Sequence, residues 1–291
     1  MRMVYHIGVH GTDGDRMLKT LLNNRAWLSK NRTEVVTPNR HRGIFDEALA
    51  ALNGGAATAE MEQIMLDAVL DSDDPRRIVC TSAGFLGVPA RAIGPEGLYP
   101  QAGARIAALA NLFPSATSEF FVAIRNPATL IPEVLALMPD GGDYAALMGD
   151  TDPETLSWLP AVQRMAKGAQ GRRLVVWCHE DVPLIWPDVT RMVGGMPPDV
   201  PLSGGLLYMH ELLGDQGLRQ LRGDLTGRDL SISARRDVFA DHLGRNALAD
   251  VVDQQIDLPG WTQDRVDRIT ARYHADLAQI AALPGVEFIL P

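Results

Sequence analysis

The residues best suited to chemistry lie in a short loop near the start of the chain. Residues 3–9 form an apolar run rich in Val, Tyr and Ile, which indicates a buried strand, and leucines follow at helical spacing up to residue 28. The segment between them combines glycines with polar and charged residues: Gly8, Gly11, Thr12, Asp13, Gly14, Asp15 and Arg16. A strand that ends in a glycine turn and opens a helix leaves free backbone N–H groups at the positive helix end. The segment therefore predicts an anion-binding loop.

The same loop allows other interpretations. It has no Gly-Lys-Ser or Gly-Lys-Thr, so an ordinary nucleotide triphosphatase is excluded. Asp13 and Asp15 suit the N-cap of the following helix, but carboxylates beside a phosphate could also hold Mg²⁺. Gly8 and Gly11 could serve only as turn residues, and Arg16 could be a solvated helix residue.

Arg125 is the second residue with a predicted role. It follows the apolar residues 119–124, which indicate a central strand, and precedes Pro127. Open α/β sheets bind ligands at the carboxyl ends of their strands, and a buried cation needs a partner. We therefore predict that Arg125 lies beside the loop 11–16, with an acidic side chain or a bound anion on its guanidinium.

Three histidines could titrate near pH 7. His10 lies in the first loop, His41 follows the second predicted strand, and His179 ends the run 173–178. His10 and His41 are candidate general bases, and a structural role is the alternative for each of the three. No His, Cys or Asp spacing is typical of a metal site, so no metal is expected.

Strands and helices alternate along the first two thirds of the chain. Apolar runs at 3–9, 34–37, 77–81, 119–124 and 173–178 indicate strands, and helical patterns lie at 17–28, 44–52, 59–70, 102–113, 129–138, 153–167 and 184–193. Such alternation predicts a three-layer α/β fold with a parallel sheet. Residues 196–291 contain helical patterns at 215–225, 233–252 and 262–282 and a short run at 286–290. We interpret them as a mainly helical extension of a single domain, 1–291.

Composition limits the class of protein. The 291 residues are 46% hydrophobic and 22% charged, with a net charge of −9, which argues against a nucleic-acid partner. No apolar run reaches the roughly 18 to 20 residues of a membrane span. The first residues show no secretory cleavage pattern, so no signal peptide is expected. The two cysteines, Cys80 and Cys178, are expected to be free thiols, and the cytoplasm is the expected compartment.

Several segments, in order, resemble bacterial sulfotransferase-family proteins with a P-loop-like fold. Residues 5–8 (YHIG) and 24–28 (NRAWL) are similar to the opening of that family. Residues 121–127 (FVAIRNP) resemble its strand followed by Arg-x-Pro, which binds the 3′-phosphate of the donor. Residues 175–181 (VVWCHED) and 258–262 (LPGWT) are also similar.

The resemblance implies a donor site with a departure at each end. Residues 11–16 would face the 5′-phosphosulfate of 3′-phosphoadenosine 5′-phosphosulfate, and Arg125 its 3′-phosphate. Gly11 stands where the family has its phosphosulfate-binding lysine. Thr12 keeps its place, while Asp13 replaces a glycine. Glu133 stands where a phosphate-binding serine is expected.

Two functions follow from this resemblance. The first is transfer of a sulfonate group from 3′-phosphoadenosine 5′-phosphosulfate to a hydroxyl or amine of a small-molecule or saccharide acceptor, with His10 or His41 as the base. The second is a non-catalytic protein of the same fold that lost the donor lysine and binds an anion, a saccharide or a protein.

Overall fold

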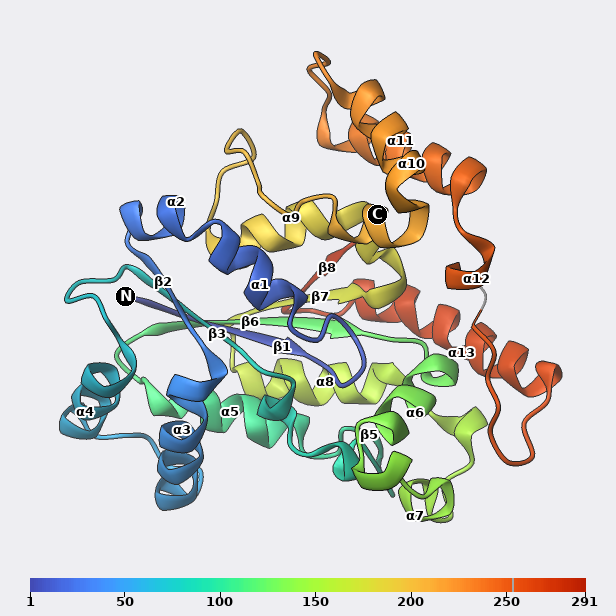
Figure 1. Ribbon diagram of the computed structural model, residues 1–291. Coiled ribbons are helices and arrows are strands. Elements are labelled where there is room, and N and C mark those ends of the chain that lie inside the picture. Colours follow the sequence, from blue (N-terminus) through green and yellow to red (C-terminus); the bar gives the residue numbers. More distant parts are fainter. Residues whose placement is uncertain (253) are drawn as a thin grey trace.

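The computed structural model describes residues 1–252 and 254–291. Parallel strands form a six-stranded sheet in the order β2-β3-β1-β6-β7-β8 (Figure 1). The strands are β1 (Arg2–Gly8), β2 (Thr33–Val36), β3 (Arg77–Thr81), β6 (Thr117–Ile124), β7 (Arg173–Cys178) and β8 (Val286–Ile289). Two short strands, β4 (Ile93–Gly94) and β5 (Gly97–Leu98), form a separate antiparallel pair.

Helices cover both faces of the sheet, which confirms the three-layer α/β prediction (Figure 1). One face packs against α3 (Pro38–Leu52), α4 (Ala59–Val69), α5 (Ala102–Leu112), α6 (Pro127–Ala136), α8 (Trp158–Ala169) and α13 (Gln263–Ala281). The other packs against α1 (Arg16–Asn23), α2 (Arg25–Lys30), α9 (Val182–Gly194) and the start of α10 (Leu207–Leu225). A short helix, α7 (Tyr144–Met148), follows α6.

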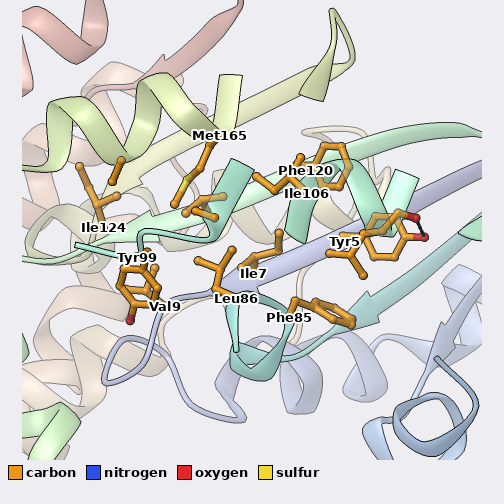
Figure 2. Close-up of a cluster of buried hydrophobic side chains, with 14 of the residues drawn as sticks. Tyr5, Ile7, Val9, Phe85, Leu86, Tyr99, Ile106, Phe120, Ile124 and Met165 are labelled. Atoms are coloured by element: carbon orange, nitrogen blue, oxygen red, sulfur yellow. Dashed lines mark hydrogen bonds between the residues drawn. The ribbon is translucent and has the colours of Figure 1, made fainter. Parts of the chain in front are cut away.

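The central strands are mostly apolar because both of their faces are buried. In β1, Met3, Tyr5 and Ile7 face the core on the α5 and α8 side, while Val4 belongs to the core on the α9 side. Tyr5 stacks on Phe120 with ring centroids 5.4 Å apart, as Figure 2 shows among its neighbours. The Tyr5 hydroxyl donates a hydrogen bond to the Leu109 carbonyl (2.8 Å), so its burial leaves no polar group unpaired.

The order of the strands creates a switch point between β1 and β6. From β1 the chain passes through α1 and α2, on one face, to β2 at the edge. From β6 it passes through α6 and α8, on the other face, to β7. The connections that leave β1 and β6 therefore diverge, and open α/β sheets bind ligands in the crevice at such a point.

Some helices begin or break at places that the sequence pattern did not indicate. The predicted helix 17–28 is interrupted at Asn24, whose side chain donates to Thr20 and Ser203 carbonyls. The predicted helix 44–52 begins at Pro38, so His41 lies within α3 rather than in a loop. The predicted helix 153–167 begins at Trp158.

The C-terminal third is only partly an extension. α10 begins at residue 207, eight residues before the predicted start, and the predicted helix 233–252 is divided into α11 (Ile232–Asn246) and α12 (Ala249–Val252). α10 and α11 pack on each other around a small core of their own and project from the sheet (Figure 1). By contrast, α13 packs on α6 and α8, and β8 pairs with β7, so both belong to the main body. Among the described residues, no helix combines the length and apolar character needed to cross a bilayer.

Candidate functional site

Three segments far apart in the sequence meet at the carboxyl edge of the sheet. β1, β6 and β7 are neighbours, with Gly8 opposite Ala123 and Ile124 opposite Cys178. The loop 9–15 follows β1, Arg125 follows β6 and His179 follows β7. The predicted anion loop and the predicted arginine are therefore brought together at the switch point.

The first loop folds back over its own strand. A Cβ atom at Gly8 would lie 2.5 Å from Asp13 Oδ1, so a side chain at this position would displace the loop. Asp13 Oδ2 accepts a hydrogen bond from the Met17 backbone N–H (3.3 Å), and its Oδ1 lies 3.3 Å from the Thr12 hydroxyl oxygen. Asp13 thus caps α1, and its carboxylate stands at the helix N-terminus, where a bound anion would lie.

His6 lies beneath this carboxylate and was given no role by the sequence. Its Nε2 is 3.8 Å from Asp13 Oδ1, and its ring stacks on Trp177 at 6.0 Å. Neither ring nitrogen has a hydrogen-bond partner within the described part of the chain. Burial lowers the pKa of His6 although Asp13 acts in the opposite direction. The imidazole is therefore neutral at pH 7 and does not neutralise Asp13.

Gly11 is held against Glu133 of α6. Gly11 has a φ of 72°, and a Cβ atom there would lie 2.4 Å from Glu133 Cβ and 3.1 Å from its Cγ. The position that the resemblance gives to the donor lysine therefore has no room for a side chain. Glu133 occupies that space, so the two departures from the family pattern are one structural feature.

The guanidinium of Arg125 is surrounded by partners. Its Nη1 donates to the Gly11 carbonyl and lies 3.2 Å from Glu133 Oε1. Its Nε donates to Thr129 Oγ1 (3.0 Å), and its Nη2 donates to Gln254 Oε1 (3.3 Å). The prediction that Arg125 lies beside the first loop with an acidic side chain on its guanidinium is confirmed.

Arg16 contacts the N-terminal part of α10, a helix that begins eight residues before its predicted start. Its Nε and Nη2 donate to the two carboxylate oxygens of Glu211 at 2.9 and 3.0 Å. Its guanidinium carbon lies 5.3 Å from the ring centroid of Tyr208. Both partners belong to the first turns of α10, which the predicted helix 215–225 omitted.

Tyr208 and His179 contain buried polar atoms with no partner. Tyr208 is 7% exposed, and its hydroxyl, like Nδ1 of His179, makes no hydrogen bond to any described residue. Leaving such a group unsatisfied costs about 1–3 kcal/mol. The rings meet edge to face at 6.4 Å. Burial lowers the pKa of His179 to about 3, with Arg125 and Arg16 adding to the effect, so its imidazole is neutral at pH 7. Burial raises the pKa of Tyr208, and the Asp13 carboxylate adds to it.

The two predicted bases lie in the interior. His10 Nδ1 is 3.0 Å from the Tyr99 hydroxyl, which also accepts the His10 backbone N–H (3.2 Å). His41 is 1% exposed and lies against the rings of Phe45 and Phe85 at 5.1 and 5.4 Å. Burial lowers the pKa of His10 and lowers that of His41 to about 4. Both are neutral at pH 7, and the structure does not bring them together.

The remaining loop residues have local roles. Thr12 is buried and donates to the Val9 carbonyl (2.8 Å). Gly14 turns the chain with a φ of 54° and open space around it. Asp15 precedes α1 but makes no side-chain cap to a described residue. Residues 1–252 and 254–291 contain no cluster of three or more His, Cys, Asp or Glu side chains arranged for a metal ion.

These observations define a three-layer α/β protein with a glycine-containing strand–loop–helix at the switch point of its parallel sheet. No family model and no curated protein matches the chain.

Proposed function

We propose that this chain is a non-catalytic, anion-binding protein on a sulfotransferase-like scaffold. The observation that supports this most directly is the placement of Glu133 against Gly11 and Arg125. The resemblance implies a lysine and a serine at positions 11 and 133 for the two ends of the donor. Glu133 alone fills the space that a lysine at position 11 would need, and it pairs with Arg125, which would bind the 3′-phosphate.

The first loop supports the same proposal. The carboxylate of Asp13 already accepts the backbone N–H of Met17 at the start of α1. A phosphosulfate there would meet this negative charge without a lysine to offset it. Loss of one group that stabilises developing charge costs about 2.7–4 kcal/mol of transition-state stabilisation, by analogy with oxyanion donors. Sulfonate transfer would therefore be strongly impaired.

Anion binding remains because one of the two arginines is held by a carboxylate that can be displaced. The side chains of Arg16 and Glu211 are 39% and 38% exposed. Ion pairs of such exposure are worth about 0–1 kcal/mol, so a ligand anion can replace Glu211 on Arg16 at little cost. The side chain of Arg125 is only 5% exposed, so its pair with Glu133 is not a surface pair of this kind.

Calorimetric titration with adenosine 3′,5′-bisphosphate tests the proposal. We expect the natural chain to bind this ligand no more tightly than inorganic phosphate, because Glu133 keeps Arg125 paired. Glu133→Gln should bind it at least tenfold tighter than the natural chain does, because the substitution frees Arg125. Glu287→Gln is the matched control, since Glu287 pairs with Arg173 at 2.8 Å and has a similarly exposed side chain. A natural chain that binds the bisphosphate far more tightly than inorganic phosphate, or equal binding by both variants, contradicts the proposal.

Sulfonate transfer is the second candidate. It is favoured by the position of Arg125, which lies beside the loop after β1 as the resemblance implies. The donor would be 3′-phosphoadenosine 5′-phosphosulfate. His10 or His41 would accept the proton of the acceptor hydroxyl or amine only after moving out of its buried position. Incubation with donor carrying radioactive sulfur and a panel of saccharide and small-molecule acceptors tests it. Label transfer that Arg125→Gln abolishes would replace the first proposal with this one.

A further inference from the structure

A second group of side chains lies at the same edge, and only Arg16 among its members has a role in the donor pattern. It consists of Arg16, Tyr208, His179 and the carboxylate of Glu211. Arg16 lies on the face of the Tyr208 ring, and Glu211 holds it there through two hydrogen bonds. Tyr208 also packs edge to face on Trp186, with ring centroids 4.9 Å apart, so the phenol is fixed from both sides.

The polar atoms within this group are unsatisfied. The Tyr208 hydroxyl and His179 Nδ1 are both enclosed and have no hydrogen-bond partner among residues 1–252 and 254–291. Buried polar groups are almost always paired in folded proteins, so an unpaired pair beside two arginines indicates a missing ligand. Because the hydroxyl has no exposed surface, a ligand can reach it only after a neighbouring side chain moves.

We propose that Arg16, Tyr208 and His179 bind a single tetrahedral oxyanion, the phosphate or sulfate group of a small molecule, and that Glu211 takes its place on Arg16 in the free protein. The inference rests on the proposed anion-binding function and names the ligand class. The donors belong to three separate elements, α1, α10 and η5 (His179–Asp181). Three separate donors suit a tetrahedral group with several acceptor oxygens better than a planar carboxylate with two.

The site contains charges of both signs. Arg16 and Arg125 act on His179 and Tyr208, while the carboxylates of Asp13 and Glu211 act on Tyr208 in the opposite direction. The positive charge available to an anion therefore increases when Glu211 leaves Arg16. His179 is neutral, and the tautomer with hydrogen on Nδ1 makes it a donor to the anion. The tyrosine hydroxyl, protonated at pH 7, is the second neutral donor.

The test uses sodium phosphate, sodium sulfate and sodium acetate at constant ionic strength, with binding measured by calorimetry on the full chain. We expect phosphate or sulfate to bind, and the ion with the higher affinity identifies the group that the ligand carries. Acetate should bind at least tenfold more weakly. Glu211→Gln should tighten binding severalfold because it frees Arg16. Tyr208→Phe should weaken binding about tenfold without lowering the melting temperature of the free protein, since the hydroxyl it removes has no partner.

Asp241→Asn is the control for net charge, because Asp241 pairs with Arg245 on the outer helix α11. It should leave phosphate and sulfate binding unchanged. Arg16→Gln provides a second variant that should abolish binding if Tyr208→Phe does not fold. Equal affinity of acetate and phosphate, or unchanged oxyanion affinity in Tyr208→Phe or Glu211→Gln, overturns the inference.

The two proposals fail separately. If phosphate and sulfate do not bind at Arg16 and Tyr208, Glu133→Gln should still bind the bisphosphate more tightly than the natural chain does, because that gain depends on Arg125. Conversely, sulfonate transfer by the natural chain would overturn the non-catalytic function, whereas phosphate binding that depends on Tyr208 would still establish this site.

Discussion

Gly11 and Glu133 are predicted to be coupled in stability. A Cβ atom in the left-handed region of Gly11, at a φ of 72°, costs about 1–2 kcal/mol. The same atom would lie 2.4 Å from Glu133 Cβ, and overpacking of this kind costs about 1–3 kcal/mol. Gly11→Ala should therefore lower the free energy of unfolding by about 2–5 kcal/mol. Only Glu133→Gly removes the clashing atom, because alanine and serine keep the Cβ.

A double-mutant cycle measured by urea unfolding tests this coupling. In the Glu133→Gly background, Gly11→Ala should cost only the backbone contribution, which gives a coupling of about 1–3 kcal/mol. Gly14→Ala is the control, since Gly14 has a φ of 54° with open space around it and should show no coupling to position 133. Additive costs for Gly11→Ala and Glu133→Gly would refute the steric reasoning. A lysine restored at position 11 alone is likewise expected to disturb the loop rather than bind a donor.

Two further predictions concern stability. Glu119 is buried and accepts a hydrogen bond from Arg77 Nη2 at 2.9 Å. Glu119→Gln should therefore lower the free energy of unfolding in urea by about 3–5 kcal/mol, whereas the exposed control Glu287→Gln should lower it by less than about 1 kcal/mol. Equal losses would contradict the buried role of Glu119. The folded pKa of His41, about 4, lies below its ordinary value of 6.5, so the unfolded chain binds the proton first as pH falls. Stability from this residue is therefore complete above pH 6.5 and lost towards pH 4, by about 2–3 kcal/mol between pH 7 and 4.5. His41→Phe should reduce this loss, and an unchanged pH dependence would show that another group causes it.

Local patterns predicted the α/β class because strands buried on both faces form apolar runs and the helices between them are amphipathic. The strands β1, β3, β6 and β7 lie within a residue or two of their predicted positions. The place of Arg125 was also predictable, since the carboxyl ends of parallel strands meet at one edge. Helix boundaries were less certain: the start of α10 has no capping side chain, so nothing in the sequence marks it at residue 207.

The chain by itself determined which residues enter the first loop and that no lysine stands among them. Only the tertiary structure decided that the loop is filled from within. Glu133 reaches Gly11 from α6, and Glu211 reaches Arg16 from α10, across more than one hundred residues in each case. Such contacts depend on how helices pack on the sheet, and no spacing in the sequence encodes them. The unpaired hydroxyl of Tyr208 is likewise visible only when every neighbour is in place.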